Sequence, residues 1–237
     1  MWRERFDEMA GIRFKDRFEA GRLLAERLRE QPVEQGIVLA LPRGGVLVGY
    51  EIACALHLPL DVILTRKIGA PFNPEYAIGV VAENGFVSIN RREIELGVAP
   101  EDYLQQAIRE NLHELARRRQ LYRGGRPLPS LSGRTVILVD DGVATGFTML
   151  GAIAAVKDQQ PGAIIVALPV APPQAVRRLE EEVDHVEVLL APEHLDGVGA
   201  WYEDFHQVSD EEVLDLLRRA QETVARSTTP DETSATW

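Results

Sequence analysis

The chain has 237 residues, of which 45% are hydrophobic and 27% charged, which fits one α/β domain with an elaboration. Its net charge of −11 argues against a general nucleic-acid-binding surface, and its apolar runs are too short to cross a bilayer. Because Cys54 is the single cysteine and residues 1–11 lack an apolar signal core, we expect no intrachain disulfide, no cysteine-rich zinc site, and a cytoplasmic protein with neither a nucleic acid nor a membrane as partner.

The first predicted elements are a helix and a strand. Asp16 and Glu19 have the spacing of a capping box, which predicts a helix directly after Asp16. Residues 36–41 form an apolar run of the length and composition typical of a buried strand.

The turn after this strand is a candidate anion site. It consists of Arg43, Gly44 and Gly45, followed by an apolar helical pattern over residues 46–56. Glycines let backbone amides approach a diphosphate, and a guanidinium can grip two of its oxygens at once. The alternative is a tightly packed turn without a ligand.

A second cationic pair follows the next predicted strand. Residues 60–64 are apolar and β-branched, and Arg66 and Lys67 come directly after them. Cations at the ends of both strands are what an anionic substrate would need in an acidic protein. The alternative is a solvated charge pair at a strand end.

The segment beyond Lys67 has the features of a lid. Residues 71–76 combine turn formers with an aromatic residue and include Glu75, a candidate acid. Residues 78–82 and 86–89 predict a β-hairpin. Such a segment could close over a ligand and exclude water. Residues 100–122 then predict a long helix that ends in a basic cluster, which is expected on a solvated face or against a symmetry partner.

The most informative stretch of the chain is residues 136–149. Its first four residues are continuously apolar and predict a strand buried on both faces of a parallel sheet. Asp140 and Asp141 follow at the carboxyl end of this strand, where open α/β sheets place their ligands. Two adjacent carboxylates in that place suit a pair of vicinal hydroxyls.

The turn after these acids suits a phosphate. Gly142 allows a sharp turn, and the small residues within 144–148 let backbone amides approach a ligand. A helix predicted to begin near Thr145 would point free N–H groups into the turn and add about half a positive charge. The alternative is that the acids only cap a helix, with Thr145 and Thr148 as ordinary first-turn residues.

The remaining elements complete an α/β pattern. Strands are predicted over residues 163–170 and 185–190, with a helix over 173–182 between them, and this alternation gives a parallel sheet. Residues 191–207 contain aromatic side chains that suit stacking on a heterocycle, although packing against the sheet is the commoner fate. The tail, residues 226–237, is polar and expected to be disordered.

Residues 136–149 resemble the phosphoribosyl-pyrophosphate (PRPP) signature of type I phosphoribosyltransferases, with four apolar residues, two acids and a Thr-Gly turn. The resemblance extends over about residues 14–208. It implies a type I phosphoribosyltransferase-like α/β fold, with a parallel sheet flanked by helices in one domain over residues 1–225. A mobile loop and insertion with a hairpin and helix would occupy about residues 66–130, and a small hood about 191–208.

The resemblance also implies a role for each part of the site. The two acids would hold the ribose 2′- and 3′-hydroxyls, the following turn the 5′-phosphate, and the first cationic loop, often with an unusual cis peptide in this family, the pyrophosphate. Mg2+ would be bound through PRPP or pyrophosphate and not in a protein metal site, and a homodimer is expected. The candidate catalytic residues are Arg66, Lys67 and Glu75, and the candidate PRPP-binding residues are Arg43, Gly44, Gly45, Asp140, Asp141, Gly142, Val143, Ala144, Thr145, Gly146, Phe147 and Thr148.

Two positions depart from common members of the family. Ala144 stands where members that act on hypoxanthine and guanine have an aspartate that handles the purine proton, so it counts against 6-oxopurine acceptors. Adenine- and uracil-type members share this alanine. Phe147 replaces a glycine found in many relatives, and we expect it to reshape the phosphate loop.

The predicted function is transfer of the 5-phosphoribosyl group from PRPP to an unidentified, nucleobase-like acceptor with release of pyrophosphate. A regulatory protein that binds PRPP or a nucleotide without turnover remains an alternative. A dinucleotide-dependent oxidoreductase is a third, suggested by Gly44, Gly45 and Gly49 after a strand, but the glycine spacing is wrong for that fingerprint.

Overall fold

The computed structural model of the chain describes residues 13–33 and 35–228. Its centre is a five-stranded parallel sheet in the order β2-β1-β6-β7-β8. These strands all lie where the apolar runs of the sequence predict them, and the predicted fold class is confirmed. Their bounds are β1 (Ile37–Ala40), β2 (Leu60–Val62), β6 (Thr135–Val139), β7 (Ala163–Val170) and β8 (His185–Leu190).

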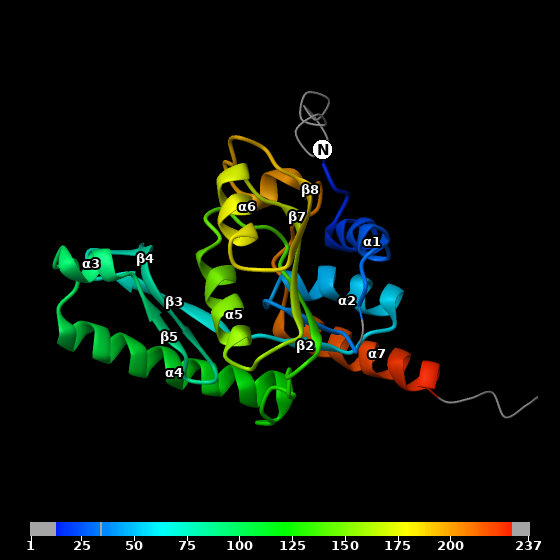
Figure 1. The fold of residues 1–237 in the computed structure, drawn as a ribbon, viewed down its shortest axis with the longest axis horizontal. Helices are drawn as coiled ribbons and strands as arrows, with labels where there is room; N and C mark the ends of the chain where they lie inside the picture. Colours follow the sequence, from blue (N-terminus) through cyan, green and yellow to red (C-terminus); the bar gives the residue numbers. More distant parts are fainter. Residues whose placement is uncertain (1–12, 34, 229–237) are drawn as a thin grey trace, which may run out of the picture.

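Helices cover both faces of this sheet (Figure 1). Val38 and Ala40 of β1 pack towards α1, α2 and α7, whereas Ile37 and Leu39 pack towards α5 and α6, as the alternation of side chains along a strand requires. No helix in the described ranges is both long and apolar enough to span a bilayer. The helices of the two layers are α1 (Arg17–Leu28), α2 (Gly45–Leu56) and α7 (Asp210–Thr228) on one face, and α5 (Phe147–Lys157) and α6 (Pro173–Glu180) on the other.

The two ends of the described chain refine the sequence predictions. Asp16 caps α1 as predicted, since its Oδ1 accepts a 2.7 Å hydrogen bond from the Glu19 amide, but the Glu19 carboxylate binds the Lys15 amide and not that of Asp16. Helix α7 extends to Thr228, so the first residues of the predicted disordered tail are helical. Residues 229–237 lie outside the described part.

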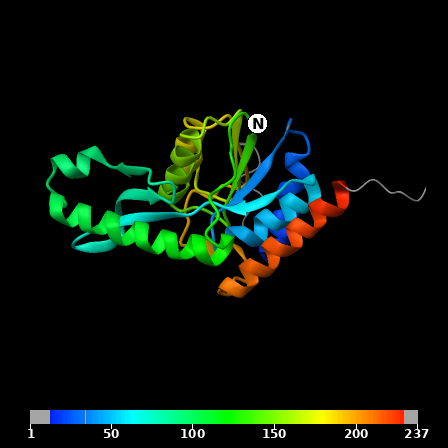
Figure 2. The same cartoon turned by 90° about the horizontal axis from the view of Figure 1, so that it is seen from below.

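Residues 65–123 form an arm that projects from the parallel sheet (Figures 1 and 2). Its antiparallel sheet has the order β3-β4-β5, and α4 runs along this sheet back to the body. The predicted hairpin is confirmed, with β4 longer than expected. The elements are β3 (Thr65–Ala70), β4 (Asn73–Ala82), β5 (Val87–Ile89), α3 (Arg91–Glu95) and α4 (Glu101–Arg123).

The arm corrects one prediction. Arg66 and Lys67 were expected in a loop, but they lie within β3, which pairs with β4. The physical reason lies in the residues that follow, because Ile68 and Ala70 are fully buried on one side of β3 and fix it in the small sheet.

Buried charges hold the base of the arm to the body. Arg123 at the end of α4 is only 4% exposed; it is paired with Glu83, and its Nε lies 3.7 Å from Asp61 Oδ1. The side chain of Asn84 also donates a hydrogen bond to the carbonyl of Ala155 in α5. The arm is therefore fixed against α5, the helix that begins at the predicted phosphate turn.

Close packing between α5 and β4 gives a test of this attachment. A Cβ at Gly151 of α5 would lie 2.4 Å from Val80 Cγ2, so Gly151→Ala should destabilise the fold by about 1–3 kcal/mol, the usual cost of overpacking, despite the better helix propensity of alanine. Urea denaturation measures the effect. Val80→Ala in the same background should recover part of the loss.

Gly197→Ala is the matched control, because a Cβ at Gly197 meets no atom within 4 Å and the backbone there is extended. Its stability should match that of the original protein. Equal stabilities for the Gly151 and Gly197 variants would show that the arm yields freely at this contact.

Candidate functional site

The predicted ribose acids and the predicted pyrophosphate loop touch each other. Asp140 and Asp141 follow β6, and the loop that follows the neighbouring strand β1 lies against them, with a cis peptide bond between Pro42 and Arg43. A Cβ at Gly44 would lie 1.9 Å from Asp141 Oδ2, and a Cβ at Gly45 would lie 2.9 Å from Asp140 Cα. Both positions therefore require glycine, because any side chain would push the loop away from the acids.

The two acids have different electrostatic environments. Asp140 keeps some accessible surface, but its carboxyl is densely surrounded by protein atoms, and this desolvation raises its pKa well above the ordinary value, with the charge of Asp141 as the second cause. Asp140 Oδ1 accepts a 2.8 Å hydrogen bond from the Asp141 amide. Asp141 is instead compensated by a cation, since its Oδ2 lies 2.8 Å from Arg17 Nε.

Arg17 is a site residue that the sequence analysis missed. It is the first residue of α1, it is only 5% exposed, and its guanidinium also donates to the carbonyl of His206 at 3.1 Å. The sequence does carry a signal for it, because Arg17 lies three residues before Ala20 and seven before Leu24, on the buried stripe of α1. An arginine on an apolar stripe needs a buried partner.

The segment predicted as a hood, residues 191–208, lies directly over Asp141. The hydroxyl of Tyr202 donates a 2.6 Å hydrogen bond to the Asp141 carbonyl, and the ring centroid of Phe205 lies 3.7 Å from the Arg17 guanidinium carbon. Tyr202 also pairs with Phe14 in an isolated parallel bridge. These aromatic residues pack within the protein here, and stacking on an acceptor base stays a prediction.

The turn after the acids has the shape expected of a phosphate nest. Ala144, Thr145 and Thr148 are exposed, whereas Val143 is buried and its amide donates to the Val170 carbonyl at 3.0 Å. Gly146 has a φ of 76° and caps α5 without a side-chain hydrogen bond to its first turn. The first amides of α5 are thus left for a ligand or water.

The conformation of this turn depends on its glycines and on Phe147. Gly142 has a φ of 149°, and a Cβ there would lie 2.7 Å from side-chain atoms of Val170 and Val198. Phe147 begins α5 and is half-buried. The turn is therefore wedged between β7 and the hood, with only its small residues facing solvent.

A cavity of about 340 Å³ separates the pyrophosphate loop from the hood. It is lined by Arg17, Arg43, Gly44 and residues 205–208. Arg43 Nη1 lies 3.9 Å from Asp210 Oδ1 at the start of α7. The cavity thus combines two arginines and a glycine turn on one side with an aromatic ring on the other, beside Asp141.

The candidate catalytic residues of the arm lie in a different setting. Arg66 Nε donates a 2.7 Å hydrogen bond to Asn111 Oδ1 of α4, and its Nη1 lies 3.7 Å from Glu114 Oε1. Hydrogen bonds from Arg117 and then Arg118 lower the pKa of Glu114 to about 2, so this carboxylate stays charged. Lys67 is exposed on β3, and the side chain of Glu75 lies outside what the structure describes.

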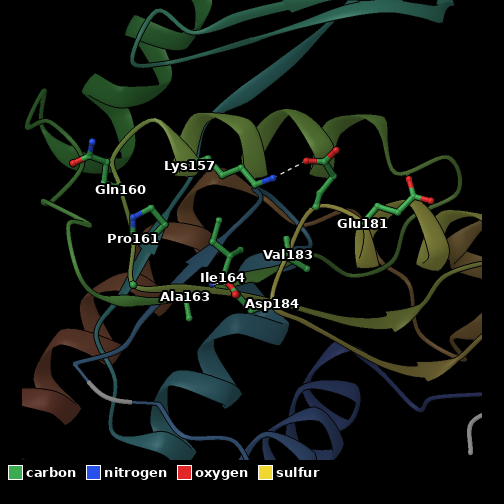
Figure 3. A pocket seen from close by; sticks show the side chains of 10 residues that line it. Lys157, Gln160, Pro161, Ala163, Ile164, Glu181, Val183 and Asp184 are labelled. Atoms are coloured by element: carbon green, nitrogen blue, oxygen red, sulfur yellow. Dashed lines mark hydrogen bonds and ion pairs between the residues drawn. The ribbon is translucent and has the colours of Figure 1, made fainter.

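A larger cavity, of about 420 Å³, lies at the opposite, amino-terminal edge of the parallel sheet (Figure 3). Its charged groups are engaged with one another or with the backbone. Lys157 pairs with Glu182 at 2.6 Å, and Asp184 accepts a 2.8 Å hydrogen bond from the Ile164 amide. We assign it no part in the chemistry.

The burial of Asp140 predicts a pH effect on stability. An acid whose pKa is raised by folding stays protonated in the folded state, while the unfolded chain loses the proton near the ordinary value of 3.8. Its contribution is therefore greatest below that pH and is lost as the pH rises towards the folded pKa. Asp140→Asn cannot ionise, so it should gain stability relative to the original protein as the pH rises from about 4 to about 7.5.

Urea denaturation of both proteins at several pH values measures this difference. Other titrating groups are common to the two proteins and cancel in the comparison. A constant difference over the whole range would mean that Asp140 is well hydrated.

Comparison with known proteins agrees with this geometry. A family model described as a phosphoribosyl transferase domain matches residues 15–197. Two relatives from Mycobacterium tuberculosis, strains CDC 1551 / Oshkosh and ATCC 25618 / H37Rv, are provisionally named phosphoribosyl transferases and are 39% identical over 217 residues, which is 90% of this chain and 48% of theirs. The chain therefore spans about half the length of these curated relatives.

A solved structure extends the comparison to the fold. The crystal structure of the protein TT1426 from Thermus thermophilus is 43% identical in sequence, with a TM-score of 0.77, and the match covers 88% of this chain and 99% of that one. Together with the match over residues 15–197, this shows that the chain belongs to the phosphoribosyl transferase domain family and has the type I phosphoribosyltransferase fold.

Proposed function

We propose that this protein transfers the 5-phosphoribosyl group of PRPP to an acceptor and releases pyrophosphate. The observation that carries the proposal is the meeting of three groups at one end of the parallel sheet. These are the acids after β6, the glycine loop after β1, and the start of α5, which has no side-chain cap. A ribose 5-phosphate with a diphosphate on C1 presents hydroxyls, a monoester and a diphosphate with a matching arrangement.

Each part of the ligand has a proposed partner. Asp140 and Asp141 would accept hydrogen bonds from the ribose hydroxyls, and residues 144–148 would bind the 5′-phosphate through backbone amides and hydroxyls. Arg43, Gly44 and Gly45 would hold the pyrophosphate beside the cavity under the hood. The same cavity would admit the acceptor.

The reaction would break the bond between C1 and the pyrophosphate oxygen as the acceptor forms a bond to C1 from the opposite face. Positive charge would develop on the ribose ring, and negative charge on the leaving pyrophosphate. Arg43 would stabilise the leaving group. Arg66 and Lys67, with Glu75 as a candidate acid, would assist only if Arg66 gave up its contacts with Asn111 and Glu114.

Magnesium would be bound mainly through the substrate. In the described parts of the chain, no three or more His, Cys, Asp or Glu residues gather to coordinate a metal ion, and the available acids are Asp140 and Asp141. Two carboxylates and several phosphate oxygens fit Mg2+, which would neutralise charge on the diphosphate. A homodimer and a cytoplasmic location stay predictions from the resemblance.

A PRPP-binding regulator is the second candidate. It is favoured by the internal pairing of the charged groups, since Arg17 neutralises Asp141, Asp210 lies near Arg43, and Glu114 lies near Arg66. A site already balanced in this way could bind PRPP without turnover.

Pyrophosphate release from PRPP, measured across a panel of acceptors, separates the two functions. We expect release with adenine, uracil or a non-nucleobase amine, and little with hypoxanthine or guanine, because Ala144 has no proton-transfer group. Asp141→Asn is the inactive control. PRPP binding by calorimetry without release for any acceptor would favour the regulator, and efficient use of hypoxanthine would contradict the reasoning from Ala144.

The two anion sites should respond separately to mutation. Arg43→Ala should weaken pyrophosphate and PRPP binding by roughly 1.5–3 kcal/mol, the usual value of a charge-assisted contact, and barely change ribose 5-phosphate binding. Thr148→Val should weaken the phosphoribosyl ligands and spare pyrophosphate. Calorimetric titration with the three ligands measures both. Equal losses for pyrophosphate and ribose 5-phosphate in Arg43→Ala would make this loop mainly structural.

A further inference from the structure

Arg17 contacts three segments that the proposed function treats as separate. Its Nε lies 2.8 Å from Asp141 Oδ2, at the ribose acids. The same nitrogen would lie 3.0 Å from a Cβ at Gly44, in the pyrophosphate loop. Its Nη1 donates to the His206 carbonyl at 3.1 Å, and its guanidinium carbon lies 3.7 Å from the ring centroid of Phe205, both in the hood.

The hood is tied to the same acid by a second contact and to the start of α1 by its backbone. Tyr202 donates to the Asp141 carbonyl at 2.6 Å. The Glu203 amide donates to the Phe14 carbonyl at 2.8 Å, and the Asp204 amide donates to the Lys15 carbonyl at 2.9 Å. Because α1 begins at Arg17, these bonds fix the hood and the guanidinium in one geometry.

Burial makes this arrangement an all-or-none one. A guanidinium that is 5% exposed cannot lose its carboxylate and stay in place, because an unpaired buried charge is strongly destabilising. If Asp141 loses its charge or turns away, the hood must open to hydrate Arg17. If the hood moves, Arg17 loses the His206 carbonyl and the Phe205 ring and holds Asp141 less firmly.

We propose that Arg17 is a positioning residue that couples the ribose-binding acid Asp141 to the closed position of the hood. The proposal rests on the proposed function, in which Asp141 binds the ribose. A hydroxyl bound to Asp141 keeps the carboxylate from turning away from Arg17, so ribose binding holds the hood closed over the cavity between Arg43 and Phe205. Coupling between the two sites is reciprocal, so a closed hood also improves ribose binding.

The first test uses the ligand-free protein and the exchange of the Glu203 and Asp204 amides with deuterium. Arg17→Met should speed this exchange by at least about tenfold, the change expected for loss of one charge-assisted hydrogen bond, and Asp141→Asn should do the same. The double variant should exchange no faster than the faster single variant, because both changes break one connection.

Arg22→Met is the matched control. Arg22 lies on the same helix, is 55% exposed and pairs with Glu51, so its loss changes the net charge equally without touching the hood. Exchange in this variant should equal that of the original protein. Equal exchange in Arg17→Met and Arg22→Met, or additive effects of Arg17→Met and Asp141→Asn, would overturn the proposal.

The second test uses ribose 5-phosphate and Arg17→Lys. Lysine keeps a positive charge beside Asp141, but it lacks the second donor for His206 and the flat surface for Phe205. Ribose 5-phosphate should slow hood exchange in the original protein. In Arg17→Lys it should bind with nearly the original affinity and leave hood exchange unchanged. A full response in Arg17→Lys would show that charge alone suffices and would overturn the coupling.

The outcomes separate this inference from the proposed function. If the original protein binds neither ribose 5-phosphate nor PRPP, the proposed function fails. The ligand-free exchange of the single and double variants then still decides whether Arg17 joins Asp141 to the hood. If Arg17→Met does not fold, Arg17→Lys provides the same ligand-free comparison, since it should also speed exchange relative to Arg22→Met.

Discussion

The structure depends on how two adjacent carboxyls are accommodated at the carboxyl end of β6. Parallel strands packed on both faces leave little water there, and desolvation and mutual repulsion would both disfavour a doubly charged pair. The protein meets this constraint unequally. Burial raises the pKa of Asp140, and Arg17 compensates Asp141 from a helix more than a hundred positions earlier in the sequence. The start of α1 and the hood are placed by that ion pair.

The same acids explain the glycines of the neighbouring loop. Gly44 and Gly45 approach Asp141 and Asp140 so closely that no Cβ fits at either position. The loop therefore supplies backbone groups and the Arg43 side chain at the point where the ribose would end and the pyrophosphate would begin. Cations gathered locally in this way let a protein with a net charge of −11 accept an anionic ligand.

The arm relates to this site through α5. Gly151 packs against Val80, and the buried pair of Arg123 and Glu83 holds the base of the arm, so the helix that starts at the phosphate turn also carries the insertion. Arg66 lies along this arm, held by Asn111 and Glu114. A role at the pyrophosphate would require Arg66 to exchange these partners for the ligand, and the arm is thus a candidate for movement during the reaction.

The sequence by itself determined the parallel α/β sheet, the position of Asp140 and Asp141, and the phosphate turn, because each rests on local properties such as apolar runs, strand ends and glycine positions. Tertiary structure alone decided which distant groups meet. It set Arg17 beside Asp141, turned Arg66 towards α4, and packed Tyr202 and Phe205 around Arg17. Pairings of this kind depend on chain reversals and crossovers that bring remote segments together, and no local pattern of residue types encodes them.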